Sequence, residues 1–175
     1  MKTTAFKKTE AWAIVFSLIF TLALTTAEAQ QKFKMAGTGD YTMIEGQAFT
    51  ISDAEGHMVR LNKAEGNNLS TGETEWMQNA RAINISFADV TMGNGFHQGY
   101  VIIEKDGNKI VSRWEGEMKT VMADEGTPLT TFEGKMWWTD ATGKYKDMHG
   151  VASYKGHFTS ENTYRVEWKG EYWKK

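Results

Sequence analysis

The sequence of 175 residues contains no cysteine. This absence excludes disulfide bonds, catalytic thiols and thiolate metal ligands. Proline is nearly absent too, since Pro128 is the single one, and a scarcity of proline suits long uninterrupted strands. Aromatic residues, by contrast, make up 13% of the chain, and each buried ring removes about 150–250 Å² of surface from water. A fold without disulfides must therefore be held by an aromatic-rich core.

The N-terminal residues have the pattern of a signal peptide. Three lysines within the first eight residues precede an apolar run at 11–24, and Ala27-Glu28-Ala29 supplies the small-x-small motif before Gln30. The alternative is a membrane anchor, which needs about 20 apolar residues, and this run is shorter. We therefore expect a signal peptide at 1–29, one domain at 30–175, and a periplasmic or secreted protein.

The sequence also lacks a strong excess of charge of either sign. Its formal net charge is −2 at pH 7, and it has no dense run of lysine and arginine. Nucleic-acid-binding domains carry a basic surface, and anionic membranes attract polybasic segments. We therefore expect no nucleic-acid partner, and no membrane partner once the leader is removed.

Alternation with a period of two residues is the dominant pattern of the remaining chain. In TYRVEWKGEYW at 163–173, every second residue from Tyr164 is apolar or glycine, and the residues between are charged. The same alternation recurs at 109–121, and more weakly at 81–87, where Ile83, Ile85 and Phe87 form the apolar set. Such alternation is typical of strands with one buried face.

Turn residues divide the chain into eight expected strands, at 40–51, 57–62, 81–92, 96–105, 109–121, 130–139, 147–159 and 163–173. The strongest hairpin signal is Asp106-Gly107, because this pair tolerates the positive φ of a tight turn. One connection is long: residues 63–80 are expected to form a polar loop that contains Trp76.

Eight sequential antiparallel strands with one apolar face predict an all-β, up-and-down, calycin-like barrel. Closure buries the apolar face and removes exposed strand edges. A two-sheet sandwich is the alternative, which long crossover connections would favour. The interior of an eight-stranded barrel is either filled by side chains or holds one small ligand.

Each of the last four expected strands places a ring and a glycine two residues apart: Trp114-Glu115-Gly116, Phe132-Glu133-Gly134, Tyr154-Lys155-Gly156 and Trp168-Lys169-Gly170. Residues two apart in a strand share a face, so ring and glycine face inward while the charged residue faces water. Glycine lets a strand coil and leaves space for a neighbouring ring, which favours a role in closing the barrel. A compatible interpretation is that the glycines leave a ring-walled cavity.

The segment TFEGKMWWTDATGKYKDMHGVASYKG at 131–156, followed by YRVEWKGEYW, resembles the C-terminal half of bacterial secreted allene oxide cyclase-like proteins. In that family a Gly-Thr-Gly-Lys-Tyr-type turn leads into a Gly-x-Gly-x-Tyr-type strand. Here Ala141 and Ala152 replace two of the usual glycines. The resemblance implies the eight-stranded barrel shared with dirigent proteins, which is often dimeric or trimeric. It implies little about activity, and it transfers no catalytic residue.

Glu45 is the candidate catalytic residue. It shares a strand face with Tyr41 and Met43. If that face is interior, the carboxyl lies in an apolar cavity, an arrangement used in acid–base catalysis, with Arg60 within reach. If the opposite face is interior, Glu45 is solvated, and the pattern leaves both open.

The expected ligand wall consists of the inward rings of the later strands: Trp114, Trp138, Tyr154, Trp168 and Tyr172. We expect a small apolar or aromatic molecule to bind there. An allene oxide cyclase-like isomerase assisted by Glu45 is the alternative, so whether the chain is an enzyme stays open. A third possibility is a filled barrel that associates with further copies through Trp137, whose side chain is expected to point outward.

Histidine offers no metal site. Zinc needs three or four converging ligands, and the four histidines include no His-x-His or His-x3-His spacing. His57 and His97 adjoin turns, while His149 and His157 are eight residues apart, so we expect solvated or rim histidines. No Gly-x-Ser-x-Gly elbow or phosphate-binding loop is present. We expect neither a metal nor a cofactor.

Overall fold

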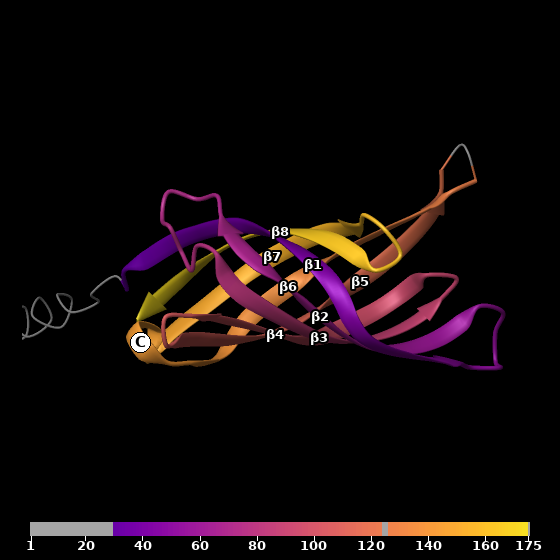
Figure 1. Ribbon diagram of the computed structural model, residues 1–175, viewed down its shortest axis with the longest axis horizontal. Helices are drawn as coiled ribbons and strands as arrows, with labels where there is room; N and C mark the ends of the chain where they lie inside the picture. The colour runs from indigo at the N-terminus through magenta and orange to yellow at the C-terminus, as the bar shows by residue number, and fades with distance from the viewer. Residues whose placement is uncertain (1–29, 124–125, 175) are drawn as a thin grey trace, which may run out of the picture. The chain divides into compact units, whose positions relative to one another are not determined.

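The structure is a computed structural model that describes residues 30–123 and 126–174, so the expected signal peptide lies outside the described residues. Its elements are β1 (Lys32–Thr50), β2 (His57–Ser70), β3 (Ala80–Thr91), β4 (Asn94–Lys105), β5 (Asn108–Met122), β6 (Pro128–Ala141), the 3₁₀ helix η1 (Gly143–Tyr145), β7 (Met148–Phe158) and β8 (Thr163–Lys174). Each strand pairs antiparallel with the next, and β8 pairs with β1 to close the barrel (Figure 1). The predicted up-and-down barrel is confirmed, and the sandwich is wrong. No helix in the described part of the chain is long and apolar enough to cross a membrane.

Two strands, β1 and β2, extend by eight residues each beyond the ends that the sequence predicted. β1 begins at Lys32, and β2 continues to Ser70, so the expected loop at 63–80 is confined to 71–79. The second half of β2 consists mainly of polar residues, so the sequence pattern did not predict it as part of a strand. Its inward residue Asn68 is fully buried, and its amide donates to the carbonyls of Trp76 and Met77. The polar end of β2 thus holds the 71–79 loop in place through these two hydrogen bonds.

The inner face of β3 is the opposite of the predicted one. Ala82, Ala88 and Val90 are buried, whereas Ile85 is 45% exposed on the outer wall. Large rings from other strands occupy the interior, so β3 contributes small and polar side chains to it. The space left inside the barrel by these rings, rather than the hydrophobicity of the β3 side chains, determines which face of β3 points inward.

Rings lie across glycines of the neighbouring strand. The register pairs Trp114 with Gly99, Phe132 with Gly156, Tyr154 with Gly134, and Trp168 with Gly37. A Cβ atom on any of these four glycines would lie 2.3–2.6 Å from an atom of the paired ring. The glycines therefore provide the space into which rings pack, as the closure interpretation predicted.

The two ends of the barrel differ. At one end the loop 71–79 inserts Trp76 and Met77, which pack with Tyr145 of η1 and the fully buried Ile110. At the other end the β1–β2 and β5–β6 hairpins project (right side of Figure 1). The barrel is closed at the first end, which we call the floor.

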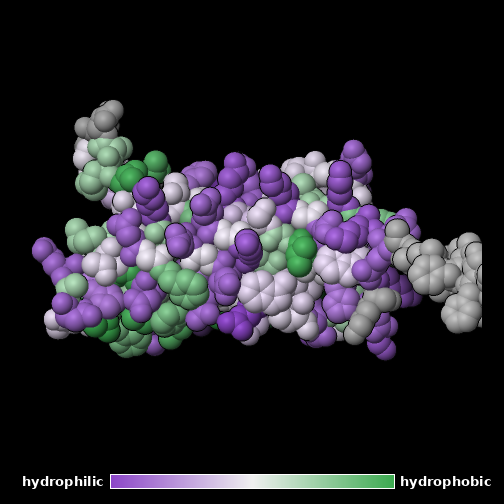
Figure 2. All heavy atoms as spheres, turned by 180° about the vertical axis from the view of Figure 1, so that it is seen from behind, coloured by the Kyte–Doolittle hydropathy of each residue, from purple (hydrophilic) through white to green (hydrophobic). Residues whose placement is uncertain are grey.

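The outer wall is mixed in polarity. Seen from behind, Figure 2 shows hydrophilic side chains over much of the wall and hydrophobic ones on the projecting β5–β6 hairpin at upper left. Trp137 pairs in register with Arg113 and with the exposed Val151, so it points outward as predicted. The Arg113 guanidinium lies 5.8 Å from the centroid of the Trp137 ring. Association of copies through Trp137 stays a prediction.

Candidate ligand-binding cavity

A cavity of about 880 Å³ occupies the barrel interior. Its lining extends from Trp76 at the floor to Gly56, Gly93, Thr127 and Ser160, which belong to the four turns at the opposite end. This end is the mouth of the cavity. Small-molecule sites in proteins measure about 300–1,000 Å³, so the interior has the volume of a ligand site.

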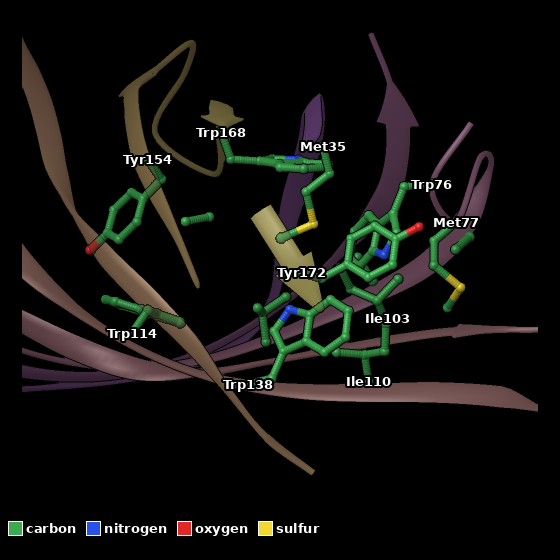
Figure 3. Packing of buried hydrophobic residues seen from close by; sticks show 14 of the residues in the cluster. Met35, Trp76, Met77, Ile103, Ile110, Trp114, Trp138, Tyr154, Trp168 and Tyr172 are labelled. Carbon is green, nitrogen blue, oxygen red and sulfur yellow. The ribbon is translucent and has the colours of Figure 1, made fainter. Parts of the chain in front are cut away.

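Trp76 forms the floor of the cavity. Its ring stacks on Trp138, with centroids 5.8 Å apart, and meets the edge of Trp168 at 5.1 Å. Figure 3 shows Trp76, Trp138 and Tyr172 gathered on one side of the packed cluster, and Trp114 and Tyr154 on the other. Sequence reasoning assigned Trp76 to a polar loop and missed this role.

Four of the five predicted wall residues line the cavity: Trp114, Trp138, Tyr154 and Trp168. Tyr172 does not line it. Its ring is buried against Trp138, at a centroid distance of 5.6 Å, and against Phe33 at 5.2 Å. Tyr172 therefore packs with Trp138 and Tyr145 at the floor end of the barrel rather than on the cavity wall.

Glu45 lies outside the barrel, so of the two alternatives that the sequence left open the solvated one holds, and the candidate role of Glu45 in an interior site is wrong. A β-bulge between Met43 and Glu45 inserts Ile44 as an extra residue, and the alternation changes face there. Met43 lines the cavity, whereas the Glu45 side chain is 69% exposed and forms an ion pair with Lys63 at 3.0 Å. No turn residue marks this bulge in the sequence.

His97 and Tyr154 form a hydrogen-bonded pair on the cavity wall. His97 is 7% exposed, and its Nε2 lies 3.1 Å from the Tyr154 hydroxyl. Burial lowers the pKa of His97 to about 4, against the opposing effect of a hydrogen bond with the Glu133 backbone. Burial also raises the pKa of Tyr154, with a smaller contribution from Glu115. Both side chains are neutral at pH 7, and the prediction that this histidine is solvated or at the rim is wrong.

A second polar group crosses the interior from β3. The Trp114 Nε1 donates to Asn84 Oδ1 at 2.9 Å, and Asn84 Nδ2 donates to the Tyr164 hydroxyl at 2.7 Å. Tyr164 stacks on Tyr41, with centroids 5.1 Å apart. Burial raises the pKa of Tyr164 to about 12, while the hydrogen bond from Asn84 opposes the shift. The interior thus presents neutral hydrogen-bonding groups. The alternation at 81–87 did not reveal Asn84, because it predicted that Ile83, Ile85 and Phe87 face inward.

His57 ties the mouth together. Its Nδ1 lies 2.5 Å from Asp53 in the β1–β2 turn, and its Nε2 lies 2.7 Å from Asp89 on β3. The hydrogen bonds with Asp53 and then Asp89 raise the pKa of His57. Both ring nitrogens are therefore engaged at the rim. Among the described residues, no group of three or more His, Cys, Asp or Glu side chains is arranged to hold a metal ion.

Comparison with known proteins bears on the fold. No protein-family model matches the chain, and no curated protein matches it. A solved structure of a pterocarpan synthase dirigent protein does match, with a TM-score of 0.50 and 10% sequence identity, over 83% of this chain and 92% of that one. The chain has the dirigent-like barrel fold. The resemblance seen in residues 131–173 is thereby confirmed at the level of the fold. At 10% identity, no site residue of the dirigent protein can be assigned to a position of this chain.

Proposed function

We propose that the dirigent-like barrel binds a small apolar or aromatic molecule in its interior. The observation that carries the proposal is the ring-lined cavity of about 880 Å³, floored by Trp76 and open at the mouth. A barrel that served only as a filled structural core would have no use for an interior of this volume, because protein cores pack densely. The leader-like sequence at 1–29 supports binding in the periplasm or outside the cell.

Neutral polar groups would orient the ligand inside the cavity. The Tyr154–His97 pair and the Asn84–Tyr164 pair both reach the lining. A few placed polar groups in an apolar site fix the orientation of a ligand and exclude others. The ligand should therefore be mainly apolar, with an oxygen or nitrogen atom that meets one of these groups.

A neutral aromatic dye, N-phenyl-1-naphthylamine, tests this proposal on the chain from residue 30. We expect saturable, blue-shifted dye fluorescence with one dye per chain. Ala88→Trp adds a ring on the inner face of β3 and should weaken dye affinity at least about tenfold, because it fills the cavity. Ser153→Trp adds the same ring to the outer wall of β7, where Ser153 is exposed, and should leave dye affinity unchanged.

A different result would contradict the proposal. If folded protein binds neither the dye nor a panel of small aromatic molecules, the interior is no ligand site. Equal effects of the two tryptophan variants would place the dye on the surface rather than in the cavity. Either result would favour an interaction domain instead.

An acid–base isomerase is the second candidate function, and the His97–Tyr154 pair favours it. A neutral imidazole accepts a proton and a tyrosine hydroxyl donates one, which are the two events of a proton shift within a bound molecule. The matched structure is named a pterocarpan synthase, so the fold is compatible with catalysis. Glu45 has no part in this candidate, because it lies outside the cavity.

The isomerase candidate predicts hydrogen exchange in a bound ketone. In D₂O, the wild-type chain should speed deuterium uptake next to the carbonyl of a small aryl ketone, as measured by NMR. Tyr154→Phe and His97→Gln should each remove most of this acceleration while dye affinity persists. Exchange at the uncatalysed rate with the wild-type chain would leave binding as the function.

A further inference from the structure

A second, smaller pocket lies on the side of the barrel near the mouth, and we call it the side opening. The pairing of β1 with β8 ends at Thr42 and Thr163, and the backbone N–H of Met43 donates to the carbonyl of Asn162 at 2.8 Å. Beyond this point β1 continues to Thr50, paired in this part with β2. The side opening therefore lies between the end of β1 and the β7–β8 turn.

The side opening and the central cavity share four lining residues: Met43, Arg60, Asn62 and Glu161. The two spaces therefore adjoin at these residues. The side opening is also lined by Ile44, Ala48, Gln47 and Glu45, whose carboxylate pairs with Lys63, so its lining is mixed in polarity.

Arg60 lies on the inner face of β2. It shares that face with the buried Ala64 and Asn68, which also line the cavity. In register, Arg60 pairs with Ala88, and Ala88 pairs with His97. Only the small Ala88 side chain separates Arg60 from His97 in the register, and both Arg60 and His97 line the cavity.

The Arg60 guanidinium has no ion pair or side-chain hydrogen bond with the described residues, whereas Arg81 pairs with Glu65 and Arg165 pairs with Asp40. Arg60 and Glu161 are the formally charged side chains among the described residues that line the cavity. Glu161 belongs to the β7–β8 turn at the rim, not to a strand. The inner wall thus carries one positive charge without a carboxylate partner.

We propose that this cavity takes an aromatic carboxylic acid, whose ring lies among the tryptophans and whose carboxylate binds Arg60 beside the side opening. The proposal rests on the proposed function, since it names the chemical class of the ligand. A guanidinium presents parallel N–H donors that match the two oxygens of a carboxylate. Arg60 itself is exposed at this end of the barrel, so the pair is an accessible ion pair rather than a buried one.

A matched pair of ligands tests the proposal: 1-naphthylacetic acid and its uncharged amide, 1-naphthylacetamide. We expect the acid to bind the chain about two- to fivefold more tightly than the amide, the effect of an ion pair with an exposed arginine. Arg60→Gln should abolish this difference without changing amide affinity. Glu161→Gln should tighten acid binding, because it removes a nearby negative charge.

Arg81→Gln is the control, since it removes an arginine from the outer wall, and it should change neither affinity. Should Arg60→Gln fold poorly, added salt provides the same readout, because it weakens an ion pair but not amide binding. An acid-to-amide ratio near one, or a ratio that Arg60→Gln leaves intact, overturns the role of Arg60 while dye binding still supports the proposed function. Failure of acid, amide and dye alike overturns both.

Discussion

Replacing Gly134 by alanine should destabilise the barrel by about 3 kcal/mol or more, since overpacking a closely fitted site costs this order of free energy. A Cβ atom at this position would lie 2.1 Å from the Glu115 carbonyl oxygen and 2.5 Å from the Tyr154 hydroxyl. Neither neighbour can withdraw, because one is backbone of the adjacent strand and the other is held by His97. Urea denaturation followed by tryptophan fluorescence measures the loss.

Gly107→Ala is the matched control for this prediction. No atom lies within 4 Å of a Cβ there, but the backbone has a φ of +74°. Its expected cost is about 1–2 kcal/mol, from the left-handed conformation alone. In a Tyr154→Ala background, Gly134→Ala should cost less than in the wild-type chain. Equal costs in the two backgrounds would show that the ring does not occupy the glycine space.

Removing the floor should be the second large effect. Trp76→Ala is expected to lower the free energy of unfolding by about 3–5 kcal/mol, the usual range for deleting a large buried aromatic side chain. Trp76 is 4% exposed and packs against Trp138, Trp168 and Tyr145. Thermal and urea unfolding of the variant provide the measurement.

Trp76→Phe is the control for the floor. Within the described residues, the Trp76 Nε1 is buried without a hydrogen-bond partner. Phenylalanine keeps a ring and sacrifices no hydrogen bond, so it should cost clearly less than alanine. If the two variants are equally unstable, the floor needs the full width of the indole, and a single ring does not replace it.

The later strands of the barrel were predictable from sequence because they obey simple alternation. In β5 and β8 the large apolar residues face inward and the charged ones face water, so Trp114 and Trp168 were assigned correctly. The spacing of rings and glycines in the later strands also predicted that glycines make room for rings where the barrel closes. Where aromatic side chains fill the interior, the most hydrophobic residues are also the buried ones, so alternation alone predicts which face of a strand points inward.

The earlier strands were harder because their inward residues are small or polar. Ile85 faces out while Asn84 faces in, since the interior already holds the ring of Trp114, to which the Asn84 amide is hydrogen-bonded. His97 is buried against Tyr154 of β7, a partner far away in the sequence that a period-two reading cannot supply. The partners of Asn68 are the carbonyls of Trp76 and Met77, which lie nearby in the sequence but in a loop, so alternation along a strand does not reveal them either.

Glu45 shows a different limit. Its assignment failed because of one inserted residue, Ile44, which changes the face of everything after it. No glycine or proline marks the insertion point itself. The bulge depends on how β1 meets β2 and the β7–β8 turn, which is a property of the closed barrel. A single extra residue thus decided between an interior and a solvated carboxylate.

The Trp76 floor has a kinetic consequence. Because the barrel is blocked at the floor, a ligand must both enter and leave at the opposite end, through the mouth or past the side opening beside it. Residence time would then depend on the rim, where His57 fastens the β1–β2 turn to β3. Loosening that fastening should speed exchange in both directions while leaving the equilibrium occupancy set by the rings below.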